Sequence, residues 1–310
     1  MRSLGFEKSD FYRIGASLAA ASLVCWLAID DTPVDRVKSG YESILHSDED
    51  DGTTTTVPSA SVNFAAGSPN MPCSPGEIIY GVETQEPVIA ITIDDGPSLT
   101  TTRANLAVAK KYGAKLTLFP IANRVLLVEG QNILKEALAD GHEVDTHSYS
   151  HTLGDPSVNA DQQQLAVGIF QNALGFVPYA NRAPGLAVNE ALLQATILSG
   201  QCFIDISEGS DTKDWQCDFA DSPAIAQAGI ERRASQVSMK PGSILLMHDE
   251  MTDTAANGGR NRARATSPYE LELLLQRAAA LGLRTVTVSE LLKMGPHINS
   301  AVPDNSQSDC

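Results

Sequence analysis

Two adjacent carboxylates, Asp94 and Asp95, stand between an apolar run and a Gly-Pro step. The run Val88–Ile93 has the composition of a strand, and Gly96 and Pro97 cannot continue it, so both acids are expected where a strand ends. At a turn both side chains can be aimed at one cavity, where like charges push their pKa values apart. One carboxylate is then able to bind a metal while its neighbour takes a proton. The alternative is a solvated turn, because Asp, Gly and Pro are all common turn residues.

Two histidines, His147 and His151, follow the strand-like run Glu143–Thr146. Two imidazoles four residues apart fall on one face of a helical turn, so both can reach a single ion. With one carboxylate of the Asp pair they form a set of two His and one acid, which leaves coordination positions open for water and substrate, as in catalytic zinc sites. An isolated His pair is more often structural, so this interpretation depends on the two acids upstream.

Three further stretches supply an arginine, an acid and a third histidine. Arg182 is permanently charged and, placed beside a carboxylate, favours its ionised form and fixes its orientation. Asp214 precedes Trp215, one of two tryptophans, whose flat ring suits the wall of a sugar-binding groove as well as it suits a core. His248 ends the apolar run Ile244–Met247, where an imidazole can act as a general acid near neutral pH.

Strand-like and helix-like segments alternate from about residue 77. The strand-like runs are Val88–Ile93, Lys115–Phe119, Glu143–Thr146, Cys202–Ile206, Ile244–Met247 and Thr285–Val288. The helix-like runs are Thr101–Tyr112, Gln131–Asp140, Asp161–Leu174, Asn189–Leu198, Pro223–Val237 and Pro268–Leu281. This alternation predicts parallel βαβ units that carry the polar groups at or just after strand ends, as in barrel enzymes.

The five stretches around Asp94, His147, Arg182, Asp214 and His248 resemble, in this order and spacing, the five motifs of the polysaccharide deacetylase family. The family is also called the NodB-homology domain or carbohydrate esterase family 4. Any one motif is weak, whereas five in register are specific. The resemblance, over residues from about 85 to 293, implies an α/β fold, a distorted (β/α) barrel. It also implies a hydrolase that uses a divalent metal, usually zinc, to remove N-acetyl groups from a GlcNAc-containing polysaccharide such as peptidoglycan, chitin or an exopolysaccharide.

The resemblance also assigns the residues of the reaction. Asp95, His147 and His151 would hold the metal, and Asp94 would act as general base toward a metal-activated water. His248 would act as general acid and protonate the departing amine.

Five other positions carry supporting roles by the same resemblance. Arg182 would orient the base, and Asp214 would support either that arginine or the histidine acid. The backbone N–H of Gly185 would stabilise the oxyanion, and Trp215 and Leu246 would line the groove. The family commonly has an aromatic residue where this chain has Gly185, which removes a wall of the groove and loosens the loop.

Two other functions compete with this one. The same fold and metal set would also hydrolyse an O-acetyl ester of a polysaccharide or a non-sugar amide. A member that only binds glycans has usually lost its base, its acid or a metal ligand, and this chain retains residues for all three roles.

The first 76 residues differ from the rest in composition. The uncharged run Ile14–Ile29 has a basic flank before it and an acidic one after it, which favours an uncleaved signal anchor over a signal peptide within residues 1–29. Residues 30–76 are expected to be a flexible linker and residues 296–310 a disordered tail, around a catalytic domain at 77–295. Positive charge stays inside, so the catalytic domain is expected outside the cytoplasm, periplasmic or at the cell surface, or secreted if the segment is cleaved.

Charge and cysteine content restrict the partners. The formal charge of −16 repels nucleic acid, and the five cysteines include no CxxC pair to hold zinc. Cys202 and Cys217 flank the fourth motif, and we expect a disulfide between them to brace it. The stretch Glu250–Thr266 is long for a βα connection and reads equally as a lid, a subsite or a disordered surface loop.

Overall fold

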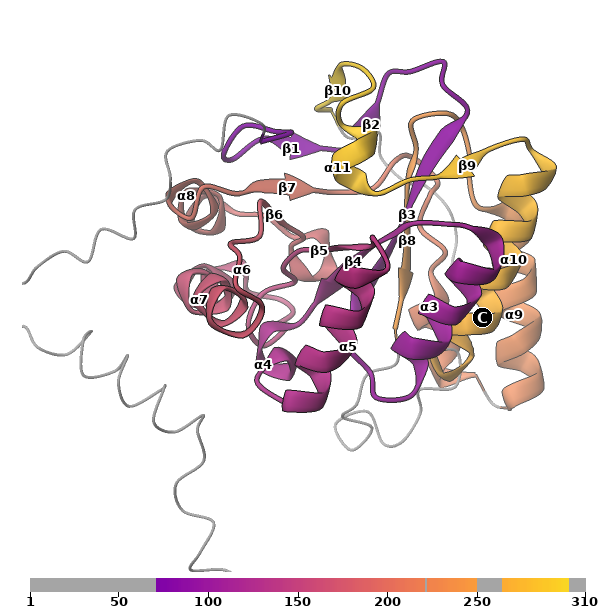
Figure 1. Cartoon of the computed structure of the whole chain (residues 1–310), viewed down its shortest axis with the longest axis horizontal. Coiled ribbons are helices and arrows are strands. Elements are labelled where there is room, and N and C mark those ends of the chain that lie inside the picture. Colours follow the sequence, from indigo (N-terminus) through magenta and orange to yellow (C-terminus); the bar gives the residue numbers. More distant parts are fainter. Residues whose placement is uncertain (1–70, 221, 250–263, 301–310) are drawn as a thin grey trace, which may run out of the picture. The chain divides into compact units, whose positions relative to one another are not determined.

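The computed structural model describes residues 71–220, 222–249 and 264–300 (Figure 1). The expected anchor, most of the expected linker and most of the long stretch after His248 lie outside these residues. Among the helices that the structure describes, none combines the length and the apolar character needed to cross a membrane.

The central strand β3 (Val88–Asp95) organises one parallel sheet, and all eight of its residues are buried. It lies between β4 (Leu116–Pro120) and β8 (Ile244–His248), while β5 (Glu143–Val144) pairs with β4 at the edge. The short strand β9 (Arg284–Thr285) pairs with the first residues of β3. A Val- and Ile-rich run of this kind is typical of a strand covered on both faces.

A second parallel sheet completes a ring. Its order is β1 (Ile78–Ile79), β7 (Cys202–Ile204), β6 (Ala180–Asn181). Isolated parallel bridges link the segments beyond the strand ends: Thr146, after β5, pairs with Asn181 of β6, and Asp211, after β7, pairs with Leu246 of β8. The strands therefore close into a ring through two irregular seams, which confirms the predicted α/β fold of the distorted (β/α) barrel type.

Helices cover the outside of this ring (Figure 1). They are α3 (Thr101–Tyr112), α4 (Ala122–Val125), α5 (Val128–Ala139), α6 (Pro156–Asp161), α7 (Gln163–Leu174), α8 (Glu190–Leu198), α9 (Pro223–Gln236), α10 (Ser267–Ala280) and α11 (Val288–Leu291). Three 3-10 turns are η1 (Pro184–Leu186), η2 (Asp214–Phe219) and η3 (Arg264–Thr266).

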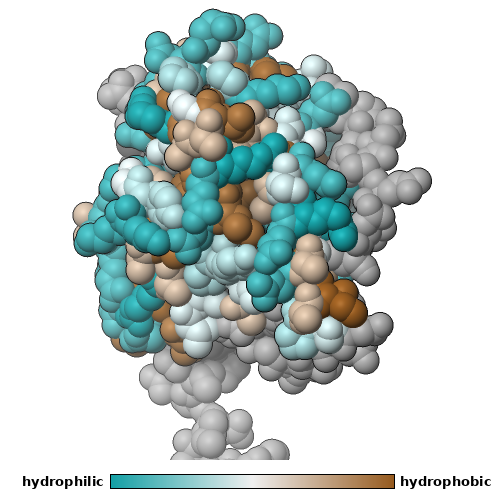
Figure 2. All heavy atoms as spheres, turned by 90° about the vertical axis from the view of Figure 1, so that its right-hand side faces the viewer, coloured by the Kyte–Doolittle hydropathy of each residue, from teal (hydrophilic) through white to brown (hydrophobic). Residues whose placement is uncertain are grey.

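The longer helices are amphipathic. On α10 the buried residues Leu271, Leu274, Leu275 and Ala278 recur every three or four positions and share one core cluster with Ile91. Figure 2 shows the molecule from the side on which α9 and α10 lie in Figure 1, where hydrophilic residues dominate. One face of each helix thus packs on the strands and the other meets solvent.

Both ends of the catalytic domain extend beyond the predicted bounds. Cys73 forms a disulfide with Cys202 of β7, so residues 71–76 belong to the domain and not to the linker. The strand β10 (His297–Ile298) pairs antiparallel with β2 (Gly81–Val82), so the tail is ordered as far as residue 300. Residues 301–310 lie outside the described part of the chain.

The expected pairing of Cys202 with Cys217 is wrong. Cys202 is bonded to Cys73, 129 residues earlier in the sequence. Cys217, in η2, is itself in a disulfide, but not with Cys202. Position in the sequence does not determine which cysteines lie close together, and Cys73 falls within the predicted linker.

Candidate active site

The two acids lie at the end of β3, where parallel pairing sets Asp94 opposite Phe119 of β4 and His248 of β8. Asp95 has a φ of 78°, in the left-handed region, and so departs from the alternation of strand side chains. His147 Nε2 lies 3.5 Å from Asp94 Oδ2 and 3.7 Å from Asp95 Oδ1. One imidazole therefore contacts both carboxylates, as expected of acids aimed into one cavity.

The two histidines meet through a turn and not through a helix. No helix is assigned over residues 147–151, where Ser148 and His151 have φ values of 60° and 55°. The Ser148 hydroxyl accepts the backbone N–H of His151 at 2.9 Å, and the ring centroids of His147 and His151 are 4.9 Å apart. The expectation of a shared helical face was wrong, although the two rings do converge.

Asp95, His147 and His151 form a set of potential metal ligands whose ligand atoms all lie within 4.8 Å of one another. His151 Nε2 is 3.3 Å from Asp95 Oδ1. The Nδ1–H of His147 donates to the Arg182 carbonyl at 2.8 Å, which leaves the Nε2 lone pair facing the acids. Burial lowers the pKa of His151 to about 4, so this imidazole is neutral and able to ligate. Two imidazoles and one carboxylate suit a divalent metal with open positions.

Arg182 is fully buried and holds Asp94 in place. Its Nη1 donates to Asp94 Oδ1 at 2.8 Å and to the Thr92 hydroxyl at 2.6 Å, and its guanidinium lies 4.4 Å from the centre of the Phe119 ring. Its Nε and Nη2 donate to the main-chain carbonyls of Ile204, the last residue of β7, and of Asp205. A rigid, planar group held by four hydrogen bonds fixes the orientation of the carboxylate it binds.

Asp214 lies against His248, one of the two partners that the sequence left open for it. The Nδ1–H of His248 donates to Asp214 Oδ1 at 2.6 Å, and the backbone N–H of His248 donates to Oδ2 at 2.8 Å. The backbone N–H of Trp215 donates to Oδ1 at 2.9 Å. Because an ionised acid only accepts hydrogen bonds, this arrangement places the His248 proton on Nδ1 and leaves Nε2 for exchange with a substrate.

The remaining predicted residues differ in exposure. Trp215, at the start of η2, is 41% exposed and accessible to a ligand, whereas Leu246 of β8 is buried. Gly185 has a φ of 61° within η1, and a Cβ built there would lie 3.3 Å from Leu153 Cδ2. The turn at Gly185 therefore uses a backbone conformation that favours glycine.

Asp249 is a site residue that our sequence reasoning missed. Its buried carboxylate accepts the hydroxyls of Thr101 and Thr102 at the start of α3, and its backbone N–H donates to the Asp94 carbonyl at 2.9 Å. Asp249 thus connects β8, α3 and the end of β3. The only feature of the sequence that could have indicated Asp249 is its place directly after His248 at the end of an apolar run.

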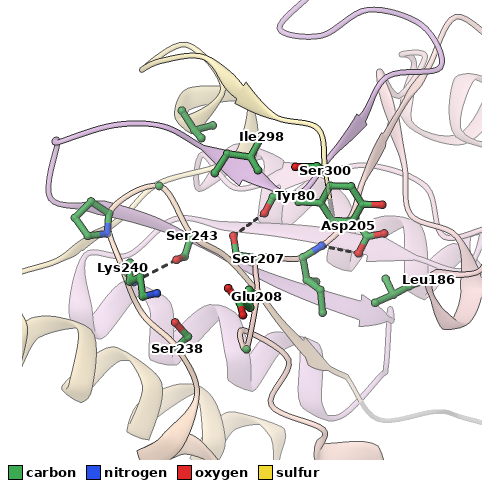
Figure 3. A pocket seen from close by; sticks show the side chains of 15 residues that line it. Tyr80, Leu186, Asp205, Ser207, Glu208, Ser238, Lys240, Ser243, Ile298 and Ser300 are labelled. Carbon is green, nitrogen blue, oxygen red and sulfur yellow. Dashed lines mark hydrogen bonds between the residues drawn. The ribbon is translucent and has the colours of Figure 1, made fainter. Parts of the chain in front are cut away.

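A separate cavity of about 490 Å³ lies beside the site (Figure 3). Tyr80, Asp205, Ser207 and Lys240 are among its lining residues, and Leu186 borders it just after Gly185. None of the residues of the acid and histidine cluster lines this cavity. The acid and histidine cluster is therefore a site distinct from this cavity, formed where the strands end.

Comparisons with known proteins agree with this geometry. The family model of polysaccharide deacetylases matches residues 81–200. A peptidoglycan-N-acetylglucosamine deacetylase of Bacillus cereus is 30% identical over 225 residues, which are 70% of this chain and 94% of that protein. The structure of the chitin deacetylase of Colletotrichum lindemuthianum aligns with a TM-score of 0.56 and 23% identity, over 72% of this chain and 95% of that one. A family 4 acetyl xylan esterase of Clostridium thermocellum, solved with a cobalt ion, aligns with a TM-score of 0.54 and 25% identity, over 67% of this chain and 93% of that one.

Proposed function

Because the chain belongs to the polysaccharide deacetylase family, we propose that it removes N-acetyl groups from the GlcNAc units of a cell-envelope polysaccharide. The observation that carries the proposal is the position of His147, which contacts Asp94 and Asp95 at once. That contact places a potential metal ligand and a potential general base side by side. Peptidoglycan is the preferred substrate, since the 30% identical relative carries that name, with chitin-like polymers and exopolysaccharides next.

Asp95, His147 and His151 would hold the metal, and we propose zinc because the donor set is two imidazoles and one carboxylate. A bound divalent metal supplies a Lewis acid that polarises the acetyl carbonyl and lowers the pKa of water. The Nδ1 contact of His147 with the Arg182 carbonyl keeps its other nitrogen aimed at the ligand position.

Asp94 would take the proton of the attacking water. Arg182 holds one of its oxygens at 2.8 Å, which leaves Oδ2 on the side of His147. The backbone N–H of Gly185 is the proposed donor to the oxyanion that forms on the acetyl carbon.

His248 would protonate the amine as it leaves. Asp214 holds the ring by the Nδ1–H, so Nε2 is the atom that delivers the proton. This role requires Asp214 to stay ionised and accept hydrogen bonds. The three N–H groups that donate to it, from His248 and Trp215, favour that state.

An O-acetyl ester is the second candidate substrate, on the strength of the likeness to an acetyl xylan esterase at 25% identity. Amide and ester share the same attack on an acetyl carbonyl. They differ in the leaving group, because an amine needs a proton from His248 more than a sugar alkoxide does.

We further propose that the catalytic domain lies outside the cytoplasm, held by the apolar segment at 14–29. The disulfide between Cys73 and Cys202 supports an oxidising compartment.

The test measures acetate released by the full-length protein from N-acetylglucosamine oligomers, peptidoglycan and acetylated xylan. Release from the first two that stops on chelation, returns with zinc and is lost in Asp94→Asn supports the proposal. Release from acetylated xylan alone would replace the amide by the ester, and no release from any of them would reject the proposed function.

A further inference from the structure

Glu270 is a buried acid that the proposed mechanism does not use. It is the fourth residue of α10, has no exposed surface, and neither of its carboxyl oxygens has a hydrogen-bond partner. An ionised carboxylate in such a place is strongly unfavourable, because it has left water and gained nothing in exchange. The buried Glu270 carboxyl group is therefore expected to be either protonated or bound by a neighbouring group.

The oxygens that lie against the Glu270 carboxyl belong to Thr212 and Asp214. The Thr212 hydroxyl is also buried and also lacks a hydrogen-bond partner. Burial and then the charge of Asp214 raise the pKa of Glu270 well above its usual value, and His248 opposes this from beyond Asp214. Asp211 also interacts electrostatically with His248. Glu270 thus lies next to Asp214, which in turn binds the proposed acid His248.

Two ionised carboxyl groups have no donor between them, so the contact becomes a hydrogen bond only when one of them carries a proton. The donors already present decide which one does. Asp214 accepts three N–H groups, which favour its ionised form, whereas Glu270 accepts no N–H group and has only the Thr212 hydroxyl beside it, which lowers its pKa less than burial and Asp214 raise it. The proton belongs on Glu270.

We propose that Glu270 is a positioning residue, a neutral carboxylic acid that donates its O–H to Asp214 and thereby fixes Asp214 against His248. Glu270 touches neither substrate nor metal ligand in this scheme and acts through Asp214 alone. Its effect on the reaction rests on the proposed function, whereas its neutral state is a property of the fold and is testable without a substrate.

The first test is the pH dependence of unfolding for the full-length protein and Glu270→Gln. Above the ordinary pKa of 4.5, the unfolded chain releases the Glu270 proton and the folded chain keeps it, so this residue makes folding less favourable as the pH rises. Glutamine cannot ionise. The stability of the variant relative to the wild type should therefore increase between pH 5 and pH 7, by about tenfold in the unfolding equilibrium constant per pH unit.

Glu272→Gln is the matched control on the same helix. Glu272 is paired with Lys111 at 2.5 Å, and hydrogen bonds from Lys111 and Tyr112 lower its pKa. It is ionised in both states above pH 6, so the difference between this variant and the wild type should stay constant there. A constant or falling difference for Glu270→Gln as well would overturn the proposal.

Infrared spectroscopy gives a second readout. Because it is recorded on the wild type, it remains informative even if the Glu270→Gln variant does not fold. The wild type at pH 7 should show the C=O stretch of protonated carboxylic acids, to which the buried Asp145 also contributes because burial raises its pKa, and Glu270→Gln should reduce the intensity of that band. A wild-type spectrum without any such band would show that Glu270 is ionised.

Activity then tests the link to His248. Glu270→Gln keeps a neutral donor and should retain kcat, whereas Glu270→Leu should lower kcat by about tenfold at unchanged KM, as loss of a supporting hydrogen bond does. Equal loss in both variants would mean that the charge matters and would overturn the assignment. If the unfolding and infrared results hold but no glycan releases acetate, the proposed function fails while the neutral Glu270 stands.

Discussion

At the scale of single residues, the site depends on buried side chains that fix the orientation of the proposed base and the proposed acid. Arg182 has no exposed surface and bonds Asp94, Thr92 and two main-chain carbonyls. Asp214 likewise bonds both the ring and the backbone of His248. The proposed base and acid are therefore each held by one buried partner of opposite hydrogen-bonding character.

Arg182→Lys keeps the positive charge but loses the planar fork that reaches Asp94 and the carbonyls together. We expect kcat/KM for acetate release to fall by about 100-fold or more, because the base loses its orientation. Arg277→Lys is the control, since Arg277 of α10 bonds the carbonyls of Ala234 and Val237 and none of the acid and histidine cluster. Equal losses in the two variants would assign the effect to general destabilisation.

Asp214→Asn and Trp215→Ala should separate catalysis from binding. The amide offers His248 a donor or a weaker acceptor, so we expect kcat to fall by about 10²- to 10⁴-fold at similar KM. Trp215 is 41% exposed and contributes its ring, so its loss should raise KM and spare kcat. Steady-state kinetics on N-acetylglucosamine oligomers distinguishes the two patterns, and the reverse assignment would contradict this account.

At the scale of elements, the end of β3 is fixed by contacts with β8 and α3. Asp249 accepts Thr101 and Thr102 of α3 and donates its N–H to the Asp94 carbonyl. Gly96 packs against the Asp249 carboxylate, and a Cβ at this position would lie only 2.9 Å from Asp249 Oδ2. The position of Asp95 therefore depends on a contact between three elements.

Gly96→Ala should destabilise the fold by about 1–3 kcal/mol through this overlap. The added methyl group meets the Asp249 carboxylate, so Asp249→Ala should remove the conflict. In a double-mutant cycle followed by urea unfolding, we expect Gly96→Ala to cost less in the Asp249→Ala background than in the wild type. Strict additivity would show that the strain lies elsewhere.

The sequence predicted the long helices and strands best, whereas its runs Glu143–Thr146 and Thr285–Val288 correspond to two-residue strands, β5 and β9. The run Val88–Ile93 became β3, and the helix Thr101–Tyr112 was predicted with the bounds it has in α3, because each has an apolar pattern over several turns or pleats. Two-residue strands such as β1 and β10 have too few residues to show any period. The convergence of His147 and His151 came from positive φ angles, which sequence spacing does not encode. Glu270 was missed because a single acid in an amphipathic helix is normally on its solvent face.

At the scale of the whole molecule, one bond connects the start of the domain with the barrel wall. Cys73 is bonded to Cys202, and Gly76 donates its N–H to the neighbouring Gln201 carbonyl at 2.8 Å. The disulfide joins two residues that are 129 positions apart in the sequence and so closes a long covalent loop. Its contribution to stability comes mainly from restricting the unfolded chain.

Cys73→Ser should lower the free energy of unfolding by about 2–5 kcal/mol while acetate release at low temperature is retained. Cys73 does not lie among the acid and histidine cluster, so the loss should appear in the melting temperature alone. Cys202→Ser and the double variant should match the single variant. A double variant that is much less stable than either would contradict the shared bond as the cause.

The same disulfide also determines how the domain responds to a cut in its chain. Because Cys73 and Cys202 stay joined, the chain between them remains one covalent loop even after every hydrogen bond is lost. That loop contains Asp94, Asp95, His147, His151 and Arg182, whereas Asp214 and His248 lie beyond it in the sequence. A single protease cut inside the loop would therefore leave both fragments attached to each other, and they would separate only after reduction.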